Sequence, residues 1–156
     1  METSAASARR RTKTKNPLHR GRVLALQVLY EVDVTTHEWE PSMEAHAEAT
    51  AATPRVAAFA EAIVRGVIEA LGRIDGLIRE NAPLWPVEQL SPVDRNVLRL
   101  AIFELLPGSD VPPKVVINEA VELAKEFGGE ASARFVNGVL GSAFEQLAAT
   151  EKTTTD

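Results

Sequence analysis

The stretch SPVDRNVLRLAIFELLPG, residues 91–108, predicts an α-helix with a recognisable start and end. Ser91 is a typical N-cap residue, and Pro92 follows it at the first helical position, where a missing N–H costs nothing. Asp94 stands where its carboxylate can accept hydrogen bonds from the free N–H groups of the first turn. The Pro-Gly pair at 107–108 ends the helix, because neither residue continues helical geometry well.

The same start and stop signals recur along the rest of the chain. Thr53-Pro54 begins one predicted helix, Pro112-Pro113 begins another, and Gly128-Gly129 closes the latter. The alternation of apolar and polar residues that is typical of strands is almost absent. Apolar residues recur instead at helical spacing, in three stripes: Val97, Leu98, Ala101 and Leu105; Ile117, Ala120, Val121, Ala124 and Phe127; and Val136, Val139, Leu140, Ala143 and Leu147.

Earlier segments of the chain have the same helical pattern. We predict helices over 19–35 and 54–80, the second broken near Gly72, and a short helix at about 41–50. The fold class is therefore all-α. The expected architecture is a bundle of about six or seven helices, in two layers that share one core.

The prolines of the chain suggest how this bundle is organised. We predict one helical domain over 18–148, with an N-terminal group of helices over 18–82 and a C-terminal group over 90–148. The two prolines in residues 81–90 mark a hinge between the groups. The tail 149–156, which ends in TEKTTTD, is expected to be disordered.

Charge is unevenly distributed along the chain. The formal net charge of the whole chain is −5, yet residues 1–22 contain seven bases and a single acid. Residues 1–17 have almost nothing to bury, so they are expected to form a disordered basic arm. A basic arm on an acidic body is typical of a chain that meets a polyanion, although a solubilising tail would look the same. The candidate phosphate contacts are Arg9, Arg10, Arg11, Lys13, Lys15, Arg20 and Arg22.

The sequence argues against most catalytic and metal sites. It contains no cysteine, which excludes disulfides, thiol nucleophiles and cysteine-ligated metals. His19, His37 and His46 have no metal-ligand spacing, and the last two are expected on the surface. The paired glycines at 128–129 precede no Walker lysine, and the serines lack a nucleophile-elbow context. We therefore predict no enzyme activity, no metal and no cofactor.

Targeting signals are missing as well. No apolar run approaches the roughly 18 residues that cross a bilayer, so no membrane association is expected. No apolar segment of a secretion signal follows the basic N-terminus. The expected location is the cytoplasm.

Polar and aromatic residues at the start of the last predicted helix are candidates for binding. Phe135 lies next to the apolar stripe and follows Arg134, and an edge aromatic beside an arginine can stack on an unpaired base. The alternative is that Phe135 packs in the core while Asn137 caps a backbone group. Tyr30 is expected to be buried, with its hydroxyl hydrogen-bonded.

A polar ridge on the helix of residues 91–106 is a second candidate. Asp94, Arg95 and Arg99 form this ridge. It is either solvated surface or an interface with a partner.

Three segments of the chain resemble one bacterial family. The stretch 90–107, then DVPPKVVINEAVELAKEF (110–127) and ARFVNGVLGSAF (133–144), look like the NusB family of transcription antitermination factors. The opening HRGRVLALQVLYEVD (19–33) is similar to the basic, then apolar, first helix of that family. The same motifs occur in the NusB-like domain of certain rRNA methyltransferases. No methyltransferase segment follows here, which favours a stand-alone factor.

The resemblance implies a function and a set of site residues. Members of the family are all-helical and bind boxA, a single-stranded RNA element of rRNA leader transcripts. They do so together with NusE, a small-subunit ribosomal protein, within the antitermination complex of RNA polymerase, and they assist rRNA maturation. Some relatives are homodimers. The RNA surface implied here comprises the arm, with His19, Arg20 and Arg22, together with Tyr30, Arg134, Phe135 and Asn137; Asp94 lies near the face implied for NusE.

Two other functions are weaker alternatives. The short connection at 107–113 resembles the turn of a helix-turn-helix DNA-binding protein, but acidic residues line the helix that follows, and these suit a major groove poorly: Glu119, Glu122 and Glu126. The other alternative is a structural homo-oligomer that associates through an apolar patch near Asp94.

Overall fold

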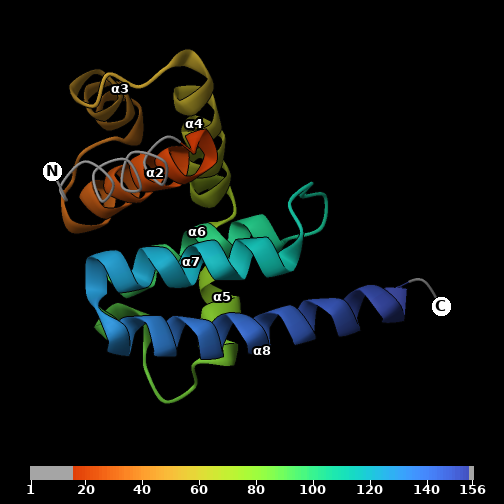
Figure 1. Cartoon of the computed structure of the whole chain (residues 1–156). Helices are drawn as coiled ribbons and strands as arrows, with labels where there is room; N and C mark the ends of the chain where they lie inside the picture. The colour runs from red at the N-terminus through yellow and green to blue at the C-terminus, as the bar shows by residue number, and fades with distance from the viewer. Residues whose placement is uncertain (1–15, 155–156) are drawn as a thin grey trace, which may run out of the picture. The chain divides into compact units, whose positions relative to one another are not determined.

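A computed structural model of the chain describes residues 16–154, and side chains as far as Glu151 (Figure 1). Within this range every regular element is helical and no strand occurs, so the all-α prediction is confirmed. The elements are α2 (Pro17–Val34), α3 (Trp39–Ala49), α4 (Pro54–Glu69), α5 (Leu71–Asn81), the 3₁₀ turn η1 (Val87–Gln89), α6 (Pro92–Leu105), α7 (Pro113–Gly128) and α8 (Glu130–Thr154).

The chain divides into two compact units, and the boundary falls inside α4. One unit ends at Val64 and the other begins at Arg65. The sequence placed this boundary in the hinge at 81–90, which is wrong for this structure. Residues 81–90 form a connection within the second unit, because α5 before them packs against α6 and α8.

The first unit is built on α2, whose start is fixed by a local cap. The Asn16 side chain accepts a hydrogen bond from the backbone N–H of Leu18 at 3.0 Å, and Pro17 occupies the first helical position. Pro17 therefore belongs to the helix and not to the arm predicted over 1–17. Farther along, Gly21 packs directly against the ring of Phe59 on α4, where a Cβ would overlap with the ring.

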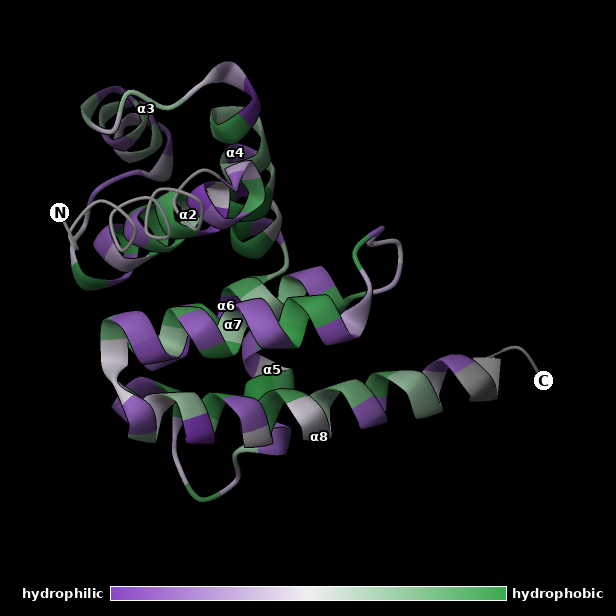
Figure 2. Ribbon diagram, in the orientation of Figure 1, coloured by the Kyte–Doolittle hydropathy of each residue, from purple (hydrophilic) through white to green (hydrophobic). Residues whose placement is uncertain are grey.

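The second unit centres on α6, which packs against α5, α7 and α8. Its cap is the predicted one: the Ser91 hydroxyl accepts a hydrogen bond from the Asp94 N–H at 3.1 Å. Its apolar stripe is fully buried, as are Val136 and Leu140 of α8. Figure 2 shows hydrophobic and hydrophilic residues following one another along α7 and α8, as expected for amphipathic helices.

The antiparallel pair α7 and α8 is joined by a tight glycine turn. Gly129 adopts a φ of 96°, a conformation that favours glycine, and its N–H donates to the Lys125 carbonyl. The predicted stop at Gly128-Gly129 is thus confirmed. At the other end α8 continues to Thr154, so the disordered tail predicted from residue 149 is wrong for 149–154.

Among the described residues, no helix is both long and apolar enough to cross a membrane.

Candidate nucleic-acid interface

The start of α8 presents the residues that the sequence analysis selected. Arg134 and Asn137 are exposed, Phe135 is half-buried, and the adjacent Val136 is fully buried. Phe135 therefore lies at the margin of the core with part of its ring accessible. This placement fits a stacking platform better than a side chain sealed in the core.

These three residues do not share one face of the helix. Successive residues of an α-helix are about 100° apart, so Phe135 and Asn137 lie about 200° apart around the axis of α8. Arg134 occupies the exposed face between them. The structure thus brings Phe135 and Arg134 to neighbouring positions, and it puts Asn137 on the opposite margin of that face.

The N-terminal end of α2 presents two of the predicted basic contacts. Arg20 is exposed and His19 is half-buried. Arg22 is not available in the same way: it is only 2% exposed, and its guanidinium lies over the Phe59 ring at 5.4 Å from the ring centre. We therefore remove Arg22 from the set of expected RNA contacts, because a buried guanidinium cannot meet a phosphate at the surface.

The burial expected for Tyr30 is also wrong. It was expected to be buried, but it is 42% exposed on α2. Its ring is therefore accessible to a ligand.

Five predicted contacts fall in the N-terminal arm. Arg9, Arg10, Arg11, Lys13 and Lys15 lie outside the described residues.

All three residues of the polar ridge on α6 are half-buried, and the two arginines use their guanidinium groups within the second unit. The Arg95 guanidinium donates to the carbonyls of Val87 and Leu90 at 3.1 and 3.0 Å, and so holds the 3₁₀ turn against α6. Arg99 forms a two-point ion pair with Asp75 of α5, with both N–O distances 2.9 Å and both side chains nearly buried. The assignment of Arg95 and Arg99 to a partner interface is therefore corrected, because both guanidinium groups bind other groups of the same chain.

Asp94 remains a candidate for partner binding. Its Oδ1 atom is buried and has no hydrogen-bond partner among the described residues. Because this oxygen is buried, it does not itself face another molecule, and the half-buried Asp94 side chain as a whole stays the predicted partner contact.

Sequence reasoning missed an exposed apolar tip in the same unit. Leu84 is 87% exposed and Trp85 is 55% exposed, in the connection between α5 and η1. The Trp85 N–H donates to the Ala82 carbonyl at 3.1 Å, which fixes the turn. The available signal was a Leu-Trp pair between two prolines, which was interpreted only as a hinge.

An acidic residue follows this tip. A backbone hydrogen bond at Glu88 and then the Arg79 guanidinium hold the pKa of the Glu88 carboxyl below its ordinary value of 4.5. Glu88 is therefore ionised under physiological conditions.

Two histidines form a small polar cluster in the first unit. The Glu31 carboxylate of α2 meets His37 Nδ1 at 3.2 Å and His46 Nε2 of α3 at 3.1 Å. The neighbouring Ser42 hydroxyl, followed by these two rings, lowers the pKa of Glu31 from its ordinary value of 4.5. From the sequence, both histidines were predicted only as surface residues.

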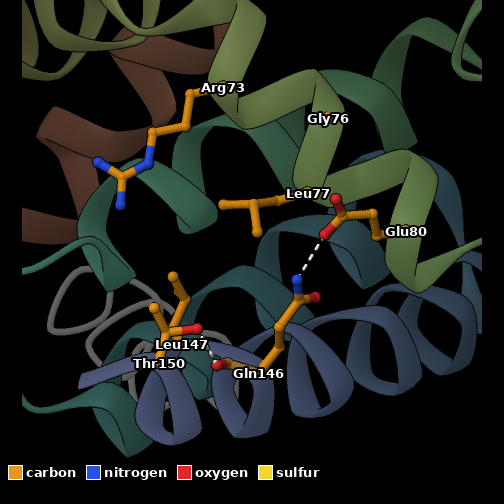
Figure 3. A pocket seen from close by; sticks show the side chains of 7 residues that line it. All are labelled: Arg73, Gly76, Leu77, Glu80, Gln146, Leu147 and Thr150. Carbon is orange, nitrogen blue, oxygen red and sulfur yellow. Dashed lines mark hydrogen bonds between the residues drawn. The ribbon is translucent and has the colours of Figure 1, made fainter. Parts of the chain in front are cut away.

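A shallow groove of about 380 Å³ lies between α5 and α8 (Figure 3). Figure 3 shows its two sides joined by a hydrogen bond from the Gln146 amide to the Glu80 carboxylate. Its lining offers no pairing of a nucleophile with a base. No group of three or more metal-ligating side chains occurs in the part of the chain that the structure describes.

Comparison with known proteins gives the family. A sequence profile described as the NusB family matches residues 19–145, which is most of the chain. The chain belongs to the NusB family. The transcription antitermination protein NusB of Dehalococcoides mccartyi strain 195 is 49% identical to it over 133 residues, which cover 85% of this chain and 93% of that protein. NusB of Chloroflexus aggregans is 46% identical over 134 residues, covering 85% and 89%.

Solved NusB structures have the same fold. A crystal structure of Thermotoga maritima NusB, 37% identical, superposes with a TM-score of 0.79 and covers 90% of this chain and 99% of its own. A chain in a structure of the antitermination factors NusB and NusE in complex with dsRNA is 25% identical. It superposes with a TM-score of 0.78, covering 85% of this chain and 98% of its own. Family membership places the chain among transcription antitermination proteins and not among enzymes.

Proposed function

We propose that this chain is an RNA-binding antitermination factor that binds boxA-type single-stranded RNA of rRNA leader transcripts together with NusE. The observation that carries the proposal is its likeness, over 85% of its length, to a chain solved in a complex of NusB and NusE with dsRNA, which supports NusE and RNA as partners. As part of the antitermination complex of RNA polymerase, it promotes processive transcription and maturation of rRNA. It acts in the cytoplasm, where bacterial transcription takes place.

The basic arm supplies much of the affinity for RNA. Seven bases in residues 1–22, with Arg22 excluded as buried, leave six cations that can neutralise phosphates. Binding to a single strand then weakens with salt by a slope of about −0.7 for each phosphate neutralised.

Aromatic and polar side chains add base contacts. The accessible part of the Phe135 ring stacks on an unpaired base, next to a phosphate held by Arg134. Tyr30, exposed on α2, provides a second aromatic surface. Asn137 hydrogen-bonds the edge of a different base, because it lies on the other margin of α8.

NusE binds the surface around Asp94. The half-buried Asp94 and the ionised Glu88 provide negative charge, and the exposed Leu84–Trp85 tip of the same unit provides apolar area. Protein interfaces typically combine apolar area with charged groups. The same surface is the one a homodimer would use, so a chain that dimerises must dissociate to bind NusE.

Competition between nucleic acids tests the proposal. A labelled boxA-type single strand is bound to the chain at low salt, and unlabelled boxA-type RNA, scrambled RNA, duplex RNA and duplex DNA are titrated in. We expect boxA-type RNA to displace the label at the lowest concentration. If duplex DNA competes equally well, the helix-turn-helix alternative replaces this proposal.

A further inference from the structure

The second turn of α2 lies directly on α4 within the first unit. Gly21 touches the Phe59 ring so closely that no side chain would fit between the two helices. Figure 1 shows the N-terminal end of α2 against α4 accordingly. A residue on the exposed side of α4 near Phe59 therefore lies close to the N-terminal half of α2.

Arg55 is such a residue. It precedes Phe59 by four residues, which is about one turn or 6 Å along the helix. Phe59 is half-buried and Arg55 is exposed, so Phe59 lies at the edge of the exposed face that carries Arg55. On α2, exposed Arg20 is adjacent to Gly21 in sequence. The two arginines thus flank the contact between Gly21 and Phe59.

Nothing in their surroundings neutralises these two arginines. Neither Arg20 nor Arg55 forms an ion pair with another side chain in residues 16–151. The first turns of α2 and α4 contain no acidic residue. Two guanidinium groups without ion-pair partners, close to the same contact between α2 and α4, attract a polyanion.

We propose that Arg55 binds a phosphate of the RNA backbone, so that the RNA path passes Arg20 of α2 and reaches α4. The inference rests on the proposed function and adds a contact on a helix that the sequence resemblance leaves out. A guanidinium matches a phosphate with two parallel hydrogen bonds. Contacts to phosphate position the RNA and carry no sequence information.

The test compares Arg55→Ala with a variant of equal charge change. Lys114, exposed in the first turn of α7, is the control, since Lys114→Ala also removes one positive charge. Affinities for boxA-type and scrambled single strands are measured at several salt concentrations. We expect Arg55→Ala to weaken both RNAs by the same factor, about fivefold at low salt, and to reduce the salt slope by about 0.7.

Further results separate the possibilities. Arg55→Lys should recover part of the affinity, and circular dichroism should show that all variants remain folded. Equal losses in Arg55→Ala and Lys114→Ala would overturn the inference, because net charge alone would then explain them. Unchanged binding in Arg55→Ala would overturn it while leaving the proposed function intact. If the wild-type chain binds neither RNA, both the inference and the proposed function are refuted.

Discussion

At the scale of single residues, the arrangement at the start of α8 limits how the proposed RNA ligand could be bound. Phe135 and Asn137 lie on opposite margins of the exposed face, with Arg134 between them. One base therefore cannot stack on Phe135 and be read by Asn137 at once. In the proposed complex, Phe135 and Asn137 therefore contact different nucleotides, on either side of a phosphate at Arg134.

Phe135→Ala should weaken boxA-type RNA by about 1–3 kcal/mol, the usual value of one base stacked on an aromatic ring. The matched control is Phe144→Ala, because Phe144 is 38% exposed on the same helix and lies about 180° around it from Phe135. Fluorescence anisotropy gives the affinities and thermal denaturation gives the stabilities. Similar affinity losses in the two variants, or a fall in stability that accounts for the loss, would contradict a stacking role.

The residue-level errors of sequence reasoning have a common physical origin. Arg22, Arg95 and Arg99 were assigned to ligands because arginine is usually exposed. Each guanidinium instead contacts another group of the same chain. Arg22 lies over an aromatic ring, Arg95 donates to backbone carbonyls, and Arg99 pairs with Asp75. The sequence shows where charge is, but the burial of a charge depends on elements that are distant in sequence.

At the scale of elements, local sequence signals predicted the helices well, but they did not predict how distant helices pack together. The starts of α6 and α7 were predictable because Ser91 and the two prolines act on their own first turns. The division of the chain into two units was not predictable, because the packing of α5 on α6 and α8 joins segments that are distant in sequence. The end of α8 was also missed: the tail contains no glycine or proline to stop the helix, and its polar composition was interpreted as disorder.

Removal of the ion pair between α5 and α6 should destabilise the second unit. Asp75→Ala leaves the nearly buried Arg99 guanidinium without its carboxylate, and breaking a buried pair in this way costs about 3–5 kcal/mol. Urea denaturation measures the loss. A cost below about 1 kcal/mol would mean that the pair behaves like an exposed one.

The contact between α2 and α3 should respond to acid. Because the pKa of Glu31 is lowered in the folded chain, its ionised form adds stability above the ordinary value of 4.5, and this is lost as pH falls through the lowered pKa. Glu31→Gln should therefore be less stable than wild type at pH 7, and the difference should shrink below pH 4.5. Denaturation curves at both pH values measure it, and a difference that is constant with pH would refute the link to ionisation.

At the scale of the whole molecule, an acidic body carries a basic N-terminal segment. Under the proposed function, the acidic body reduces nonspecific binding to nucleic acids, and the bases of residues 1–22 attract the single strand. The sequence predicted this asymmetry directly, because net charge needs no knowledge of the fold. It predicted the family from motifs spread over 19–144, but not the apolar tip at Leu84 and Trp85.

The central claim is that RNA and NusE bind this chain together and strengthen each other. The most direct measurement is the anisotropy of a labelled boxA-type RNA titrated with the chain, with and without NusE, against a scrambled RNA. We expect saturable binding that prefers boxA-type RNA and that tightens when NusE is present. Equal binding of both RNAs, unchanged by NusE and lost at moderate salt, would contradict it and would leave only a nonspecific basic arm.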